Sequence, residues 1–301
     1  MTLRWLAVAN PVAGAPGSAP RAAERLRRTG LVADVAVTAC GGDATRIARA
    51  SVGCYDGIVS LGGDGTNHEI VTGMDRARQA LALMPLGHGN CLARDLGLAV
   101  ESAAAGALAR ATESAEGIDR IGLIDLIALT LHYADGATDA RIATCSFGVG
   151  YVADATATGR GRFAGLGRAA YAAATLVTRP APLGASLSVD GTAIEAGAFT
   201  GVVVNNTLHL ANFRALPMAR VDDGRLDVIA LGGGWLRQLA HNVSIMSGVP
   251  LAGPRLERQG GCASITLRAP ATAMLDGEMV PGIVRADCTV LPRAVRCVGA
   301  A

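Results

Sequence analysis

The sequence predicts an α/β fold followed by an all-β fold: a Rossmann-like nucleotide-binding domain over residues 1–122 and an antiparallel β-sandwich over residues 123–301. Two observations predict this. In the first part, short apolar runs alternate with glycine-containing turns and helix-like patterns, which is typical of a parallel sheet with helices on both faces. From about residue 123, short strand-like runs are separated by Gly, Asp and Pro, which is typical of antiparallel strands. We leave open that the C-terminal end packs back on the first domain.

The first domain can be justified element by element. Residues 4–9 predict a strand that ends at Asn10-Pro11, and a helix over 18–29 and a strand over 32–38 follow. Gly41-Gly42-Asp43 predicts a helix start with Asp43 as its cap. Apolar runs at 57–61 and 80–84 predict two more strands, each followed by a glycine-rich turn and a helix. Ligands collect at the carboxyl ends of parallel strands, so we expect both turns and Asn10 to converge there.

The central stretch of this domain is Ile58–Met74, which reads strand, Gly62-Gly63-Asp64-Gly65-Thr66 turn, helix. Glycines let the backbone approach phosphate, and the N–H groups and dipole of a helix N-terminus favour negative charge. Asp64 would repel a bare phosphate, but it suits a divalent cation that binds carboxylate and phosphate oxygens together. The alternative is an ordinary strand-to-helix turn with Asp64 as a cap.

In the second domain, apolar runs predict strands, and two stretches predict helices at 168–178 and 235–246. The run Gly148–Ala153 mimics a dinucleotide-binding fingerprint, but it follows a strand of the β half and is interpreted as a chance match. The predicted strands lie at about 124–134, 140–149, 185–194, 201–206, 225–231, 263–270, 272–278 and 287–292.

Composition excludes several classes of protein. The chain is 50% apolar and 17% charged, which indicates a globular fold, and it has no run of about 18 uncharged apolar residues that would span a membrane. Without such a span or a signal peptide, we expect a cytoplasmic protein. A net charge of +2 does not indicate a nucleic-acid partner. Seven cysteines without a CxxC pair favour reduced thiols. No lysine is present, which excludes a phosphate-binding P-loop and a protein kinase.

Four ordered stretches resemble the diacylglycerol kinase catalytic-domain family, which includes soluble bacterial lipid kinases, sphingosine kinases and ceramide kinases. They are Asn10–Gly14, Gly62–Thr66, Pro85–Asn90 and Asp276-Gly277-Glu278. The resemblance implies an ATP- and Mg²⁺-dependent lipid kinase that phosphorylates a hydroxyl of a diacylglycerol-like or sphingoid lipid, with a role in phospholipid biosynthesis. It implies that the nucleotide is held by Asn10, Thr38, Gly62, Gly63, Asp64, Gly65, Thr66, Asn67, Gly87, His88, Gly89 and Asn90.

The resemblance also implies the catalytic and metal-binding residues. Glu278 would be the general base opposite the phosphate loops, and Asp276 would help to position the site or the metal, although Asp-Gly is also a strong hairpin signal. Asp64 would help to hold the magnesium ion of ATP. A structural Mg²⁺ would be bound by the Asp223 carboxylate and by the backbone carbonyls of Arg220 and Arg225. The alternative for Asp223 is a solvated acidic turn.

Several features leave the acceptor open. His88 and Cys91 stand where bacterial members often have Thr and Asp, and His88 either lines the nucleotide site or acts as an acid or base. Asn67-His68-Glu69 resembles a His-Glu pair of sphingosine and ceramide kinases. Arg160, Arg162 and Arg168, with Phe163 and Leu166, are interpreted either as a contact with lipid phosphate or an anionic membrane, or as a solvated loop.

The expected partners follow from this interpretation. They are a lipid substrate at a membrane surface, reached by transient peripheral association without transmembrane anchoring, and no nucleic acid; a homodimer is left open. Two other functions also remain open. One is a phosphotransferase similar to NAD kinase, whose family shares the GGDGT loop, and the other is a non-catalytic nucleotide- or lipid-binding protein.

Overall fold

The computed structural model describes residues 2–113, 118, 121–195, 198–210, 213–247 and 255–300. The chain forms two compact units, and each is described by itself. The first comprises Met1–Leu126 and Pro292–Ala301, and the second comprises Ile127–Leu291. The division after Leu126 lies close to the boundary predicted after residue 122, and the last ten residues belong to the first unit.

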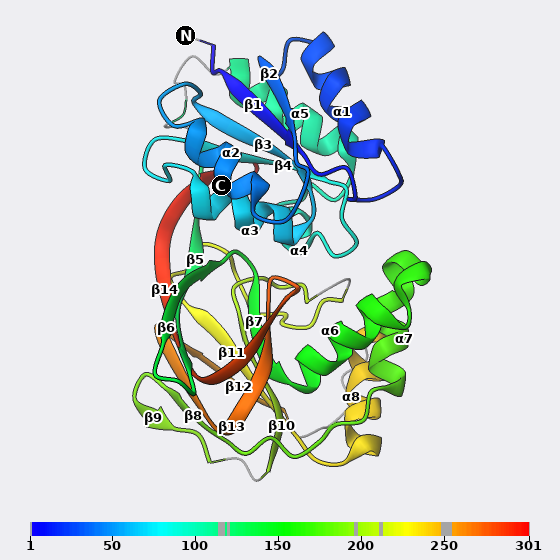
Figure 1. The fold of residues 1–301 in the computed structure, drawn as a ribbon, viewed down its shortest axis with the longest axis vertical. Coiled ribbons are helices and arrows are strands. Elements are labelled where there is room, and N and C mark those ends of the chain that lie inside the picture. The colour runs from blue at the N-terminus through cyan, green and yellow to red at the C-terminus, as the bar shows by residue number, and fades with distance from the viewer. Residues whose placement is uncertain are drawn as a thin grey trace. The chain divides into compact units, whose positions relative to one another are not determined.

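The first unit contains a parallel sheet in the strand order β2-β1-β3-β4, with helices on both faces (Figure 1). The last residues of β14 extend this sheet in parallel beside β4, through Arg296 and Cys297. The predicted α/β class is therefore confirmed. The strands are β1 (Trp5–Ala9), β2 (Asp34–Val37), β3 (Gly57–Gly62), β4 (Ala80–Pro85) and the end of β14 (Glu278–Cys297). The helices are α1 (Ser18–Arg28), α2 (Asp43–Ala50), α3 (Asp64–Gly73), α4 (Cys91–Asp95) and α5 (Glu101–Glu113).

Burial explains why β1, β3 and β4 read as continuous apolar runs. Every residue of the three strands is buried, as expected for parallel strands covered on both faces. Trp5 lies directly opposite Gly57 in the ladder, and a Cβ atom at Gly57 would come within 2.3 Å of the indole ring. The glycine therefore makes room for the largest side chain of this core.

The second unit is an antiparallel sandwich, as predicted. One sheet has the order β12-β11-β10-β7-β13, while β13 also pairs with β8 and with β14, and β14 pairs with β5. The long strand β13 changes layer, since Ala273–Leu275 pair with β7 and Ala263–Leu267 pair with β8. The strands are β5 (Leu123–Tyr133), β6 (Thr138–Ala143), β7 (Ser146–Gly150), β8 (Ala185–Val189), β9 (Thr192–Ala193), β10 (Phe199–Asn205), β11 (Leu226–Gly232), β12 (Arg255–Gly260), β13 (Cys262–Leu275) and β14.

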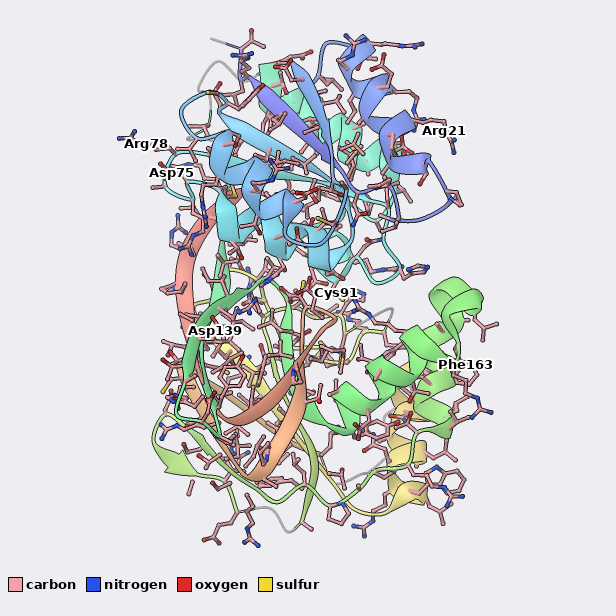
Figure 2. The ribbon with its side chains drawn as sticks, in the orientation of Figure 1. Arg21, Asp75, Arg78, Cys91, Asp139 and Phe163 are labelled. Carbon is pink, nitrogen blue, oxygen red and sulfur yellow. The ribbon has the colours of Figure 1, made fainter. Side chains whose placement is uncertain are left out.

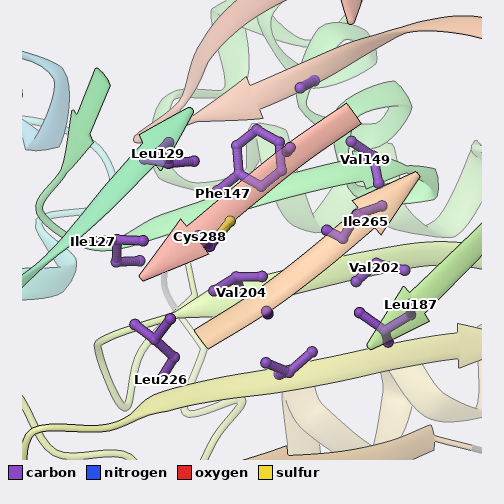
Figure 3. Packing of buried hydrophobic residues seen from close by; sticks show 14 of the residues in the cluster. Ile127, Leu129, Phe147, Val149, Leu187, Val202, Val204, Leu226, Ile265 and Cys288 are labelled. Carbon is purple, nitrogen blue, oxygen red and sulfur yellow. The ribbon is translucent and has the colours of Figure 1, made fainter. Parts of the chain in front are cut away.

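The interior of the sandwich is filled by alternate residues of its strands. Figure 3 shows Phe147, Cys288, Ile265 and Val202 packed together from four different strands. Burial raises the pKa of the Cys288 thiol, which is fully enclosed here, so this cysteine is an apolar core residue and not a reactive one. The seven cysteines all lie in the described part of the chain and form no disulfide bond there.

Helices α6 (Tyr151–Gly161), α7 (Ala170–Val177) and α8 (Trp235–Ser247) gather beside the sheet of the second unit (Figure 1). Helices α7 and α8 match the predicted ones, but α6 was not predicted. The Gly148–Ala153 run does form a strand, a glycine turn and a helix start, and Gly150 has a φ of 71°. The strand is antiparallel to its neighbours, so the run is no dinucleotide-binding unit. No helix in the described ranges is long and apolar enough to cross a membrane.

Candidate active site

The first half of the site is the edge of the parallel sheet where four strands end. Asn10 follows β1, Thr38 follows β2, Gly63 follows β3 and Gly87 lies two residues after β4. Thr38 is buried, and its N–H donates to the Ala9 carbonyl at 3.0 Å. Because parallel strands end at one edge, the residues predicted from four separate stretches are brought together here.

Asn10 and Thr66 fix the glycine turn to the neighbouring strand. Asn10 Nδ2 donates to Thr66 Oγ1 at 3.0 Å, and Asn10 Oδ1 accepts from the Val12 N–H at 3.1 Å. Thr66 packs directly over Gly62, where a Cβ atom would lie 2.4 Å from Thr66 Oγ1. Since Thr66 Oγ1 is an acceptor in this pair, its own proton can be donated to a ligand.

Asn67 makes a buried contact with the strand that precedes it. Its side chain is buried, and its Oδ1 accepts from Ser60 Oγ at 2.6 Å, inside β3. This contact anchors the first turn of α3 to the strand. This hydrogen bond uses only Oδ1, so the predicted donation from Asn67 to phosphate stays a prediction.

The two glycine loops touch each other. The Gly87 N–H donates to the Gly62 carbonyl at 3.0 Å, and a Cβ atom at Gly87 would lie 2.4 Å from the Gly63 Cα. A Cβ atom at Gly63 would lie 3.1 Å from the Gly87 Cα. Asn90, with a φ of 51°, closes the second loop by donating its Nδ2 to the Gly87 carbonyl at 2.7 Å. The glycines are thus required first for loop-to-loop packing, which holds the backbone N–H groups of both loops in place.

This packing sharpens a prediction for Gly63→Val. The new side chain should press on the Gly87 loop, cost about 1–3 kcal/mol of stability as other overpacked positions do, and weaken ATP binding by displacing both loops. The matched control is Gly106→Val in α5, where a Cβ atom would meet only the end of the Arg110 side chain at 3.5 Å. Calorimetric titration with ATP at a temperature where both variants are folded measures the effect. Unchanged affinity in Gly63→Val would remove this loop from the nucleotide site.

Asp64 is the first residue of α3, and it connects the two loops. Its Oδ2 accepts the Cys91 N–H at 3.2 Å, at the start of α4 (Cys91 is labelled in Figure 2). Asp64 is only partly buried, so its carboxylate lies between the loops and solvent. This placement fits a carboxylate that shares a cation with phosphate oxygens. Among the other residues of this loop, His88 is exposed between Gly87 and Gly89.

The start of α2 corrects one prediction. Asp43 does not cap the helix; its Oδ2 accepts from the N–H groups of Ala39 and Cys40 in the preceding turn. The helix N-terminus is instead capped by Glu69, whose two oxygens accept from Gly42 and Ala44 N–H at 3.0 Å each. The Glu of the Asn67-His68-Glu69 motif is therefore a distant helix cap, and its partners lie 25 and 27 residues earlier in the chain.

In the second unit, Asp276 and Gly277 form the predicted hairpin turn between β13 and β14, with φ values of 46° and 87°. The Asp276 carboxylate is buried and accepts the backbone N–H groups of Thr144, Cys145 and Ser146 at 2.6–2.8 Å, and Thr144 Oγ1 at 2.9 Å. It is therefore held by protein donors, which favours the predicted positioning role over metal binding. Glu278, the first residue of β14, is partly exposed.

The predicted structural metal site lies in the loop before β11. Asp223 is exposed, and its Oδ1 accepts the Arg225 N–H at 3.0 Å. Four residues after Asp223, in β11, Asp227 is buried. Its Oδ1 accepts from Gln259 Nε2 at 2.8 Å, and its Oδ2 has no hydrogen-bond partner among the described residues. Burial raises the pKa of Asp227 to about 6, with the nearby Asp223 adding to the shift. A buried carboxylate oxygen without a partner beside a second carboxylate fits a cation at this loop.

The second unit also contains a pocket that the sequence did not reveal. It lies between α6–α8 and the outer face of β10 and β11. Apolar side chains dominate the lining, and polar groups of α8 stand on one side of it. The lining includes Tyr151, Val152, Tyr171, Val203, Leu210, Phe213, Ile229, Leu231, Gln238, His241, Asn242 and Met246.

The polar side chains of this pocket are connected by a network of hydrogen bonds. Gln238 Nε2 donates to Asn242 Oδ1 at 3.0 Å, and Asn242 Nδ2 donates to Tyr151 Oη at 2.6 Å and to the Thr175 carbonyl at 2.8 Å. Burial raises the pKa of Tyr151 to about 12, so its hydroxyl stays protonated and donates to the same carbonyl at 2.6 Å. These hydrogen bonds therefore hold α6, α7 and α8 together around the pocket.

Two family profiles match most of the chain. The diacylglycerol kinase catalytic domain matches residues 4–120, and the YegS C-terminal NAD kinase beta sandwich-like domain matches residues 143–299. The two matches follow the two units in order. A solved structure of a diacylglycerol kinase from Bacillus anthracis aligns with a TM-score of 0.75 and 20% identity over 99% of this chain and 97% of that one, which supports the fold.

Curated relatives carry related names. A "Probable lipid kinase YegS-like" from Pseudomonas aeruginosa is 34% identical over 212 residues, which are 68% of this chain and 64% of that protein. One from Pseudomonas putida is 44% identical over 86 residues, 28% of this chain and 29% of its own length. A diacylglycerol kinase from Bacillus subtilis is 36% identical over 78 residues, 25% of this chain and 26% of its own. The chain thus spans less than two thirds of the length of these relatives.

Proposed function

Because this chain belongs to the diacylglycerol kinase catalytic-domain family, we propose that it is a lipid kinase. The reaction is transfer of the γ-phosphate of ATP to a hydroxyl group of a diacylglycerol-like or sphingoid lipid. The observation that supports a lipid acceptor best is the match to the diacylglycerol kinase catalytic domain and to relatives named as lipid kinases, and the apolar lining of the small pocket in the second unit agrees with it. The paired glycine loops of the first unit support the nucleotide.

The first unit supplies what phosphate binding requires. Gly62–Thr66 and Gly87–Asn90 present backbone N–H groups and the N-terminus of α3 at one sheet edge, where negative charge is favoured. Asp64 would hold Mg²⁺, which neutralises the phosphate charge when bound. The binding of ATP would be supported further by Asn10, Thr38 and the His88–Asn90 segment.

Asp64→Asn should lower turnover and leave the fold intact. Asparagine keeps an acceptor for the Cys91 N–H, but it removes the charge that attracts the cation. Higher Mg²⁺ concentrations should restore part of the activity by mass action. The control is Asp135→Asn, since Asp135 also accepts one backbone N–H, that of Ala137, in an exposed turn. The measurement is kinase activity as a function of Mg²⁺ concentration. If Asp64→Asn shows the same dependence on Mg²⁺ as the wild type, Asp64 does not bind the metal.

The second unit supplies an acceptor site of the right chemistry. Val203, Phe213 and Ile229 line an apolar recess of about 40 Å³, which would have to widen to take a hydrocarbon chain, while a dinucleotide acceptor would need charged partners for its phosphates. Glu278 would take the proton of the acceptor hydroxyl, and Asp276 would hold the turn that carries it. A cation bound by Asp223 and the carbonyls of Arg220 and Arg225 would brace the loop before β11.

The basic segment formed by the last turn of α6 and the residues after it supports access to lipid at a surface. Arg160 and Arg162 are exposed, and the Arg162 guanidinium lies 5.4 Å from the centre of the Phe163 ring (Phe163 is labelled in Figure 2). Leu166 is also exposed. The side chain of Arg168 lies outside the described part. Arginines beside exposed apolar groups suit transient contact with an anionic membrane surface.

An acceptor panel tests the proposal. Purified full-length protein is incubated with γ-labelled ATP, Mg²⁺ and one acceptor at a time: long-chain diacylglycerol, a sphingoid base, NAD or none. We expect label in one of the two lipids. Label in NAD alone would support the NAD kinase-like alternative, and nucleotide binding without transfer to any acceptor would support a non-catalytic protein.

A further inference from the structure

Helix α8 is amphipathic, but it buries its polar side and exposes its apolar side. Its buried side chains are polar: Gln238, His241 and Asn242 are 4%, 9% and 7% exposed. Apart from Arg237, its large exposed side chains are apolar, with Trp235 at 42% and Leu236 at 72% exposed. A surface helix normally buries its apolar stripe, so this arrangement calls for a partner that covers the outer face.

The apolar residues form one continuous stripe. Positions 235, 236, 239, 243 and 246 fall within an arc of about 100° on a helix of 3.6 residues per turn. Val243 and Met246 are exposed like Trp235 and Leu236. On α7, which packs against α8, Leu176 and Val177 are exposed as well.

Hydrogen bonds on the buried face of α8 fix how the helix is turned about its own axis. Asn242 donates to Tyr151 Oη and to the Thr175 carbonyl, and Gln238 donates to Asn242. Rolling the helix to bury the stripe would break these buried hydrogen bonds and leave polar atoms of Gln238 and Asn242 without partners, at a cost of about 1–3 kcal/mol for each atom. The apolar stripe is therefore held outward by specific hydrogen bonds.

The two segments that carry the stripe contain arginines but no acidic residue. No Asp or Glu occurs between Asp154 and Asp190, or between Asp227 and Glu257, and these two segments contain all of α7 and α8. Arg179, which follows α7, and Arg237 of α8 are exposed. Figure 1 shows α6, α7 and α8 side by side in the second unit. A second copy of the chain would bring like charges together, whereas an anionic bilayer satisfies both the arginines and the apolar side chains.

We propose that the stripe formed by Trp235, Leu236, Val243 and Met246 on α8, with Leu176 and Val177 of α7, docks the protein on an anionic lipid bilayer. The stripe enters the interface between head groups and acyl chains, and Arg179 and Arg237 contact the head groups. Met246 also lines the apolar pocket, so the docking face adjoins the place proposed for the acceptor chain. The choice of a bilayer as partner rests on the proposed lipid-kinase function.

Vesicle binding without ATP tests the docking surface separately from catalysis. Full-length protein is sedimented with phosphatidylcholine vesicles, with and without phosphatidylglycerol, at low and high NaCl. We expect binding that requires phosphatidylglycerol and weakens with salt. Leu236→Ser and Trp235→Ser should each weaken it about tenfold, because each loses one large apolar side chain from the interface. Val100→Ser, a change at another exposed apolar residue in the first unit, should bind like the wild type.

Kinase assays and oligomeric state complete the test. Leu236→Ser should keep the wild-type melting temperature and its activity on a dispersed short-chain diacylglycerol, and lose activity only on vesicles. Vesicle binding by Leu236→Ser and Trp235→Ser equal to that of the wild type overturns the docking surface. A wild-type dimer that dissociates in Leu236→Ser, with no vesicle binding by either, shows instead that the stripe binds a second copy. If the protein binds vesicles but transfers phosphate to no lipid, the docking surface is supported and only the proposed lipid-kinase function is contradicted.

Discussion

Glu278→Gln should lower turnover by about 10²–10⁴-fold and leave ATP affinity nearly unchanged, since positioned general bases contribute about that much to such steps. A hydroxyl that attacks phosphorus must lose its proton, and glutamine keeps the size of the side chain but not its basicity. The nucleotide loops belong to the other unit, so ATP binding should not depend on this carboxylate. Turnover and ATP affinity are measured on the same purified variant.

The controls separate catalysis from folding. Glu195→Gln is the matched substitution at an exposed residue of the same unit and should be silent. Glu278→Asp should recover little activity, because the shorter side chain withdraws the base from the hydroxyl. If Glu278 only supports the hairpin, activity in Glu278→Gln should fall together with the melting temperature. A stable variant with near-normal turnover would end the general-base assignment.

Asp276→Asn should act on stability, in contrast to its neighbour. The carboxylate satisfies three buried backbone N–H groups and one hydroxyl, which tie the β6–β7 loop to the β13–β14 turn. Asparagine tolerates the left-handed φ of 46° but points an NH₂ group at some of these donors. Since each buried donor left without an acceptor costs about 1–3 kcal/mol, we expect a loss of roughly 3–5 kcal/mol. Denaturant unfolding followed by circular dichroism measures it.

Asp190→Asn is the matched control for this prediction. Asp190 also sits in a turn with a left-handed φ, of 49°, and its Oδ1 accepts the N–H groups of Gly261 and Cys262, but these groups are exposed to water. Its loss should be small because water can replace the lost acceptor. Equal losses at both positions would show that the Asp276 contacts do not stabilise the unit as strongly as their burial implies.

The main features of the fold were predictable because local signals agreed with it. The buried strands β1, β3 and β4 read as apolar runs, and Asp276-Gly277 marked a hairpin that the structure contains. The convergence of Asn10, the Gly62–Thr66 turn and the Gly87–Asn90 turn followed from strand direction alone. These expectations rest on periodicity, turn residues and parallel topology, all of which a single sequence carries.

The remaining features depend on contacts that a sequence does not display. Glu69 caps a helix that starts 26 residues earlier, and nothing local distinguishes it from a solvated side chain. Helix α6 was not predicted because Gly159 and Gly161 make its C-terminal part look like a loop in the sequence. In α8, Gln238 and Asn242 look like a solvent face, and only their buried hydrogen bonds reveal that the apolar side points outward. Asp276 and Glu278 look equivalent until the partners of Asp276 are known.

The most direct test of the central claim is a mass balance on the reaction. Wild-type protein is mixed with ATP, Mg²⁺ and diacylglycerol in mixed micelles, and ADP and lipid phosphomonoester are quantified together. We predict one phosphomonoester formed for each ADP released, with no product when Mg²⁺ is chelated. Release of ADP without any phosphorylated lipid, for diacylglycerol and for a sphingoid base alike, would contradict the assignment of this chain as a lipid kinase.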